Sequence, residues 1–225
     1  LLPQPTMEQR IATGYVRMNP STSEGGAIPA EFQAKNNFDR ALADLNKAIE
    51  LQPQLAGAFQ RRGLAHVGKG DLDQAMKDFD EALRLKADSA DALCDRGFVD
   101  GLKRDMKKAM ADLDEAIQLK PGFAKAHFRR GLAFLALGDH DKSIGCFDEA
   151  IRLKEDYAEG FCFRGYAYHA KENFDQALKD FNEAVKLNPG LGKAYYGRSL
   201  TFRKLTKKPE ADADLDKAIE LDPAI

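Results

Sequence analysis

The sequence has no tryptophan and few cysteines, and those cysteines form no recognisable site. Among 225 residues only Cys94, Cys146 and Cys162 carry a thiol, and none belongs to a CxxC pair. An odd count without that spacing argues against a disulfide framework, a zinc knuckle and a haem attachment site. Free thiols are more typical of a reducing compartment, which favours a cytoplasmic location.

An excess of one charge sign and long apolar runs are also missing. The chain has 34 Lys and Arg against 36 Asp and Glu, a formal net charge of −2. This balance gives no overall field for nucleic acid or an anionic membrane, so neither is expected as a partner. No window approaches the roughly 18 apolar residues of a membrane span. The start, LLPQPTMEQR, is not typical of a signal peptide, and because it lacks a leading Met we expect processing or a longer parent chain.

The most informative feature of the sequence is a repeat with a period of 34 residues. Gly63, Gly97, Gly131 and Gly165 follow one another at that interval, and Ser199 holds the next position. Counting Ala56 as place 1, five repeats follow without insertion: 56–89, 90–123, 124–157, 158–191 and 192–225. We number them repeats 1 to 5 and refer to positions within them as places.

The conserved places of the repeat describe two helices that pack on each other. Place 20 is small, place 24 is large and apolar, and place 27 is always alanine. Small and large residues at spacings of three and four form one helical face that interlocks with a neighbour. Predicted N-caps precede the second helix, and prolines follow it in three repeats. These caps are Asp71, Asp105, Asp139 and Asn173, and the prolines are Pro121, Pro189 and Pro223.

A 34-residue helix–turn–helix repeat with Gly, Ala, Phe, Ala and Pro at these places resembles the tetratricopeptide repeat (TPR) family. The resemblance covers 56–225, and a further second helix at 38–55 has Ala41, Leu45 and Ala48 in the same register. It implies an all-α protein, a right-handed α-solenoid of stacked helix–turn–helix repeats. We therefore expect a solenoid over 38–225, preceded by an irregular segment over 1–37.

The segment 1–37 departs from the repeat. Thr6 and Gln9 fit a capping box, which predicts a short helix with Met7, Ile11 and Tyr15 on one face. Residues 1–40, with the run EGGAIPAEF, also resemble a cytochrome-associated domain of large exported bacterial proteins. In that family a haem-binding CxxCH follows, but none follows here, so no haem function is carried over. This second resemblance favours export, against the free cysteines, and leaves the compartment open.

An arginine precedes the glycine column in every repeat, where the TPR family more often has an aliphatic residue. Aspartate recurs at place 23, with Cys146 in its stead in repeat 3. We expect Arg–Asp pairs between helices that fix their register. Pairing within a repeat and pairing to the next repeat each give four pairs, so the sequence leaves both open. The arginines are Arg62, Arg96, Arg130, Arg164 and Arg198, and the aspartates are Asp44, Asp78, Asp112, Asp180 and Asp214.

The resemblance implies a concave surface lined by the first helices. Places 2, 5, 9 and 12 form one stripe on each of these helices, because they are spaced by 3, 4 and 3 residues. Its middle is apolar and aromatic, which is typical of a groove for a peptide, although about half of the rings are expected to fill gaps between helices. The candidate groove residues are Gln60, Leu64, Cys94, Phe98, Lys125, Phe128, Arg129, Leu132, Leu135, Cys162, Tyr166, His169, Tyr196, Leu200 and Arg203.

The carboxylate clamp, a TPR groove that grips acidic chaperone tails, is not expected here. Lys125 and Arg129 match two of its five residues, whereas Gln60, Leu64 and Asp95 stand at the other three places. Asp95 would repel a carboxylate, so we expect a groove of another specificity.

The sequence therefore predicts a non-enzymatic adaptor that binds a protein or peptide. It has no GxSxG, HExxH or P-loop motif, and His66, His127, His140 and His169 share no ligand spacing, so no catalytic residue, metal or cofactor is expected. One alternative is a scaffold that self-assembles through terminal helices, with Leu215, Ala218 and Ile219 exposed at the C-terminal end. Another is an accessory repeat domain of a longer exported, redox-associated protein.

Overall fold

A computed structural model describes residues 35–222 and 225 of the chain. The regular structure of these residues consists of eleven α-helices and contains no strand. The short helix expected near Thr6 and the helix-ending role of Pro223 lie outside the described residues. The all-α solenoid class that the sequence predicts is confirmed.

Helices alternate along the chain as first and second members of each repeat. The helix of the partial repeat, α2 (Lys35–Leu51), begins slightly ahead of the expected residue 38. Five pairs follow: α3 (Ala56–Lys69) and α4 (Leu72–Leu85), α5 (Ala90–Leu102) and α6 (Met106–Leu119), α7 (Ala124–Leu137) and α8 (His140–Leu153), α9 (Ala158–Ala170) and α10 (Phe174–Leu187), α11 (Gly192–Lys204) and α12 (Lys208–Leu221).

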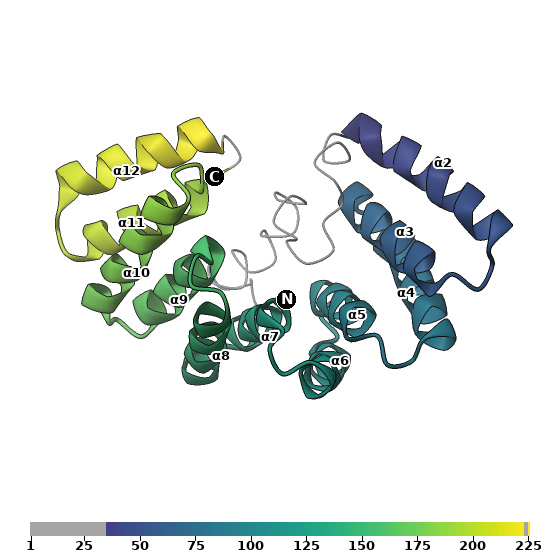
Figure 1. Cartoon of the computed structure of the whole chain (residues 1–225). Helices are drawn as coiled ribbons and strands as arrows, with labels where there is room; N and C mark the ends of the chain where they lie inside the picture. The colour runs from purple at the N-terminus through teal and green to yellow at the C-terminus, as the bar shows by residue number, and fades with distance from the viewer. Residues whose placement is uncertain (1–34, 223–224) are drawn as a thin grey trace, which may run out of the picture. The chain divides into compact units, whose positions relative to one another are not determined.

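The chain forms two compact halves, which we describe separately. The N-terminal half contains the described residues 35–129, and the C-terminal half contains 130–222 and 225. In the N-terminal half α3 packs on α4 and α5 on α6, and α4 also packs on α5 (Figure 1). In the C-terminal half α9 packs on α10 and α11 on α12, while α8 packs on α9 and α10 on α11. Each helix pair therefore covers its neighbour, as the repeat requires.

The glycine column allows an aromatic ring to lie between the two helices of a repeat. A Cβ at Gly63 would be 2.7 Å from Cε1 of Phe79, and one at Gly165 would be 3.0 Å from Cε1 of Phe181. Both rings are 0% exposed. In repeat 5 the pair is Ser199 and the smaller Leu215, so a β-carbon is accommodated there. In repeat 2, which also has a leucine at place 24, a Cβ at Gly97 would instead lie 3.0 Å from the Ala109 carbonyl oxygen, so glycine is needed there for backbone approach.

The turns between paired helices follow the expected capping chemistry. Asp71, Asp105 and Asp139 each accept a hydrogen bond from the backbone amide three residues on, at 3.2 Å, and Asn173 does so at 3.4 Å. The predicted N-caps are confirmed. In repeat 5 Lys207 makes no such bond, and Pro209 lies in the first turn instead.

Candidate functional site

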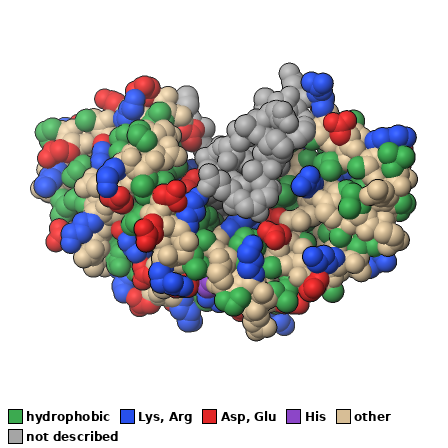
Figure 2. Space-filling model, in the orientation of Figure 1, with side chains coloured by type: hydrophobic (Ala, Val, Ile, Leu, Met, Phe, Trp, Pro, Cys, Tyr) green, Lys and Arg blue, Asp and Glu red, His purple; other side chains and the backbone are tan. Residues whose placement is uncertain are grey.

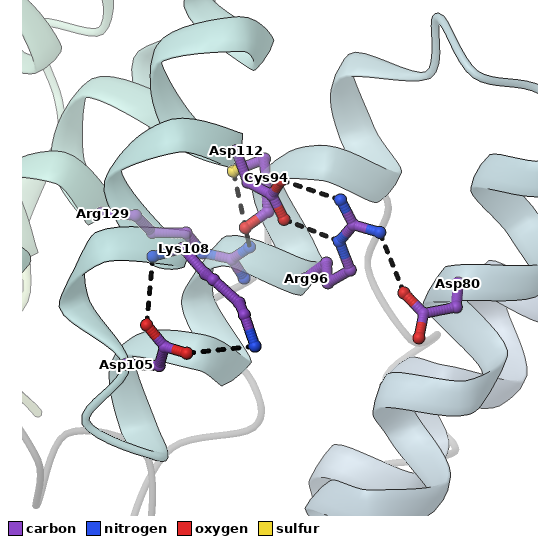
Figure 3. A network of polar contacts seen from close by, with 7 residues as sticks. All are labelled: Asp80, Cys94, Arg96, Asp105, Lys108, Asp112 and Arg129. Atoms are coloured by element: carbon purple, nitrogen blue, oxygen red, sulfur yellow. Dashed lines mark hydrogen bonds and ion pairs between the residues drawn. The ribbon is translucent and has the colours of Figure 1, made fainter.

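The arginine before the glycine column joins two second helices in repeats 1, 2, 4 and 5. In repeat 2, Arg96 donates from Nε and Nη2 to the carboxylate of Asp112 at 2.7 and 2.8 Å, and from Nη1 to Asp80 of repeat 1 at 2.9 Å (Figure 3). Arg164 bonds in the same way to Asp180 and to Asp148. Pairing therefore occurs within a repeat, which resolves the alternative that the sequence left open. The acceptor at place 25 of the preceding repeat was not foreseen.

The same arrangement recurs at both ends of the chain. Arg62 pairs with Asp78 and Asn46, and Arg198 pairs with Asp214 and Asn182. In repeats 1, 4 and 5 the guanidinium also lies over the ring at place 4, at 5.3 Å from Phe59 in repeat 1. We call the contact of one guanidinium with its two side-chain acceptors the arginine bracket. The arginines are partly exposed and their place-23 carboxylates are largely buried, so these bonds fix the two helices of one repeat against each other. The place-25 carboxylates Asp80 and Asp148, which join the preceding repeat, are 61% and 51% exposed.

In the N-terminal half a second polar network lies on the first helices, centred on Asp95 of α5. Its Oδ2 accepts a hydrogen bond from Gln60 Nε2 of α3 at 2.8 Å. Its Oδ1 accepts from Lys125 Nζ at 2.9 Å and from Arg129 Nη1 at 2.6 Å, both of α7. Asp95 is 1% exposed, and Lys125 and Arg129 are each 8% exposed. We call Gln60, Asp95, Lys125 and Arg129 the Asp95 cluster.

The charges of this network hold one another in place. Burial alone would raise the pKa of Asp95, but Lys125 and Arg129 stabilise its carboxylate and lower the pKa to about 2. Arg129 Nη1 also donates to the Cys94 carbonyl at 2.9 Å and lies 3.4 Å from Cys94 Sγ (Figure 3). Burial raises the pKa of the Cys94 thiol, which makes it a poor nucleophile.

Phe98 gives this network an apolar edge. The Arg129 guanidinium lies 4.3 Å from the centre of the Phe98 ring, a cation–π distance, and the ring itself is only partly buried. Gln60 is also partly exposed. We call the side chains of Gln60, Phe98, Lys125 and Arg129 the first-helix surface of the N-terminal half. It combines an aromatic ring on α5 with hydrogen-bond donors on α3 and α7.

In the C-terminal half most of the candidate groove residues belong to the core. Tyr166 is 2% exposed, donates its hydroxyl to the Lys193 carbonyl at 2.7 Å and packs edge-on against Phe181 at 5.1 Å between ring centres. Cys162 is 0% exposed. His169 is buried, and its Nδ1 lies 2.9 Å from Oγ1 of Thr201. These groups stabilise the stacking of α9, α10 and α11.

Exposure divides the candidate groove residues into three groups. Five are at most 2% exposed: Cys94, Phe128, Leu135, Cys162 and Tyr166. Five more are 6% to 9% exposed: Leu64, Lys125, Arg129, Leu132 and His169. Gln60, Phe98, Tyr196 and Leu200 are partly exposed, and Arg203 is exposed.

Lys193 of α11 lies on the predicted stripe but is not among the candidate groove residues, and its amine is buried. Burial lowers its pKa to about 8, against the opposing effects of the Cys162 and Asp222 charges. It holds place 2 of repeat 5, the place of Lys125 in repeat 3. Where Asp95 faces Lys125, the corresponding residue of repeat 4 is Phe163, so the carboxylate is not repeated. A comparison of aligned repeats would have found this difference.

The outer surface carries mixed charges. Figure 2 shows acidic and basic side chains interspersed over the described residues in that view.

Ile219 at the C-terminal helix is 47% exposed, whereas Ala218 is 0% exposed. The expectation that Ala218 is exposed is therefore wrong: its helix turns this alanine toward the start of α11, where a Cβ at Gly192 would lie 3.3 Å from the Ala218 carbonyl oxygen.

No group of three or more His, Cys, Asp and Glu side chains in residues 35–222 is arranged to hold a metal ion. No helix in this part of the chain combines the length and the apolarity that crossing a bilayer requires.

Comparison with protein families matches most of the sequence. Three sequence models described as tetratricopeptide repeat match residues 31–92, 124–191 and 192–225. A comparison with curated proteins gave no match.

Solved structures share the fold at low identity. YrrB, described as a TPR protein with an unusual peptide-binding site, gives a TM-score of 0.57 at 23% identity, covering 80% of this chain and 93% of that one. TTC0263, a thermophilic TPR protein in Thermus thermophilus, gives 0.68 at 19%, covering 75% and 92%. The APC/C hetero-tetramer Cut9–Hcn1 gives 0.79 at 17%, covering 97% of this chain and 44% of that chain. These likenesses establish the fold alone.

Proposed function

Because the chain belongs to the tetratricopeptide repeat family, we propose that it is a non-enzymatic adaptor that binds a peptide segment of a protein partner on the first-helix surface of its N-terminal half. The observation that carries this proposal is the partly exposed Phe98 ring stacked on Arg129. Aromatic and arginine side chains are the most frequent hot spots of protein interfaces. The repeats and the likeness to TPR proteins support a protein-interaction role in general.

The chemistry of this surface suits a peptide rather than a small molecule. The ring offers an apolar anchor, and Arg129 is held rigidly, since Nη1 bonds to both Asp95 and the Cys94 carbonyl. A donor that is already oriented loses little conformational entropy when a ligand arrives. The partly exposed amide of Gln60 adds a neutral donor and acceptor on α3. Such a surface can read an apolar side chain together with a peptide carbonyl.

The C-terminal half offers a smaller set of open side chains. Tyr196 and Leu200 of α11 are partly exposed, and Arg203 on the same helix is exposed. We propose them as a separate contact for the same class of partner. The buried Tyr166 and Cys162 support this contact from beneath and do not reach the ligand.

Site-specific photocrosslinking in source cells tests the proposal. A benzophenone amino acid replaces Gln60 on the first-helix surface in one version of the chain, and Gln118 of α6, which is exposed, in the other. We expect an adduct from position 60 that disappears when Phe98→Ala is added, with the fold of each variant checked by circular dichroism. An adduct that forms only from position 118, or that survives Phe98→Ala undiminished, would move recognition away from this surface.

A further inference from the structure

The Asp95 cluster has the composition of a carboxylate-binding site. An ammonium, a guanidinium and an amide, from three different side chains on two helices, donate to one carboxylate at 2.6 to 2.9 Å. Charge-assisted bonds of this length are the strong ones in proteins, and paired cations are the usual receptor for a ligand carboxylate. Here the carboxylate belongs to α5 of the chain itself.

The repeat itself does not require this carboxylate. Asp95 holds place 6 of repeat 2, and the same place carries Arg61, Arg129, Phe163 and Gly197 in the other repeats. Phe163 is 0% exposed and packs against Tyr166 at 6.0 Å between ring centres. A first helix can therefore be stacked with an apolar residue at this place. Repeat 2 thus differs from the other four repeats in having an acid at this place.

Occupation by Asp95 also sets the charge that a ligand meets. Lys125 and Arg129 bring two positive charges, of which Asp95 neutralises one inside the protein. A second carboxylate placed beside Asp95 would face a like charge in a poorly solvated site, which is a common means of rejecting a ligand. A neutral carbonyl or an apolar side chain meets no such repulsion.

We propose that Asp95 is a specificity-determining residue, which fills a carboxylate site from within and directs the first-helix surface toward ligand segments without an acidic group at that point. The inference rests on the proposed function, because it concerns the ligand of the same surface. The proposal predicts that, without the Asp95 side chain, Lys125 and Arg129 bind a carboxylate from solution.

Acetate tests the site itself, because it can supply the carboxylate that the Asp95→Ala variant lacks. Thermal unfolding of the Asp95→Ala chain is measured in sodium acetate and in sodium chloride at matched ionic strength. We expect the midpoint of the variant to rise with acetate in a saturable manner, while the parent chain unfolds alike in both salts. Equal unfolding of the variant in the two salts, or failure to fold in both, would overturn the proposal.

A labelled tetraglutamate peptide tests selectivity, with Asp95→Asn as the variant because the amide keeps the shape of the residue. By fluorescence anisotropy at low salt, we expect the Asp95→Asn chain to bind the peptide more tightly than the parent chain. Its Kd should be at most about one tenth of the parent value. The double variant Asp95→Asn/Lys125→Met should lose this gain. Equal binding by parent and variant would overturn the role in specificity.

The two measurements keep the failure of this inference separate from failure of the proposed function. A saturable acetate effect together with photocrosslinks that avoid position 60 would mean that the site exists while the partner binds elsewhere. Photocrosslinks at position 60 without an acetate effect would mean that the surface binds its partner and that Asp95 is only structural.

Discussion

Phe147 occupies the space that a side chain at Gly131 would need. A Cβ at Gly131 would lie 2.6 Å from Cε1 of Phe147, whose ring is 0% exposed. The ring is fully buried and lies 6.4 Å from the ring of Phe163, measured between ring centres. It cannot move away at low cost, because protein interiors are packed as densely as organic crystals.

Gly131→Ala is therefore expected to destabilise the chain. Overpacking costs about 1–3 kcal/mol, while the better helix propensity of alanine returns about 1 kcal/mol. We expect a net loss of up to about 2 kcal/mol in the free energy of unfolding, measured by urea denaturation. Gly145→Ala is the matched control, since it lies in α8 with nothing within 4 Å of its Cβ, and should stabilise slightly. Equal effects of both substitutions would contradict the packing argument.

Thr206→Gly should stabilise the C-terminal half. Thr206 has φ of 59° at place 15, where repeats 1 and 3 have Gly70 and Gly138 with φ of 81° and 77°. The left-handed conformation disfavours β-branched residues, and relief of that strain exceeds the entropy that glycine adds to the unfolded chain. We expect a gain of about 0.5–1 kcal/mol by thermal unfolding. The reverse change, Gly138→Thr, should destabilise, and a gain there would refute the explanation.

Arg96→Lys should weaken the contact between α5, α6 and α4. Lysine cannot supply the two-pronged bond to Asp112 together with the third bond to Asp80. Since the Arg96 side chain is 26% exposed, solvent screens part of the loss, and we expect about 1–2 kcal/mol by chemical denaturation. The control is Arg84→Lys, an exposed partner of Glu81 within one helix, which should leave stability unchanged.

The stability of the chain should rise with pH between about 8 and about 10.5 because of Lys193. Its pKa in the folded chain is about 8 and that of an ordinary lysine is 10.5, so in this interval the unfolded chain binds the proton that the folded chain has released. Below pH 8 burial of the charged amine costs stability in full, and between about pH 8 and 10.5 this cost falls progressively to zero. Lys193→Met should stabilise at pH 7 and flatten the profile, whereas exposed Lys179→Met should leave it unchanged.

Periodicity was sufficient to predict the helices of the repeats. In all five repeats the second helix runs from place 17 to place 30, as the columns of small and large residues required. Periodicity could not predict which aspartate pairs with each arginine, because pairing within a repeat and pairing to the next repeat both give four pairs. Only the hairpin geometry brings place 7 against place 23 of the same repeat, with place 25 of the preceding repeat on the other side.

The 34-residue period does not predict how exposed each candidate groove residue is. Tyr166 lies on the predicted stripe, yet its ring sinks into the core because Gly197 on the next first helix leaves the space: a Cβ there would be 2.8 Å from Cζ of Tyr166. Phe98 lies at the same place of repeat 2, where Arg129 stands instead of that glycine and the ring stays partly exposed. Exposure thus depends on the neighbouring repeat, which a single column does not contain.

The arginine bracket couples the unfolding of adjacent repeats. Because one guanidinium holds its own second helix and that of the preceding repeat, loss of one repeat removes a hydrogen-bond partner from the next. Each bracket is thus a nearest-neighbour coupling term, which adds cooperativity between otherwise independent hairpins. Within each half, the backbone amides of adjacent second helices should show a common hydrogen-exchange rate. An Asp80→Ala substitution should remove one repeat from the set that shares this rate.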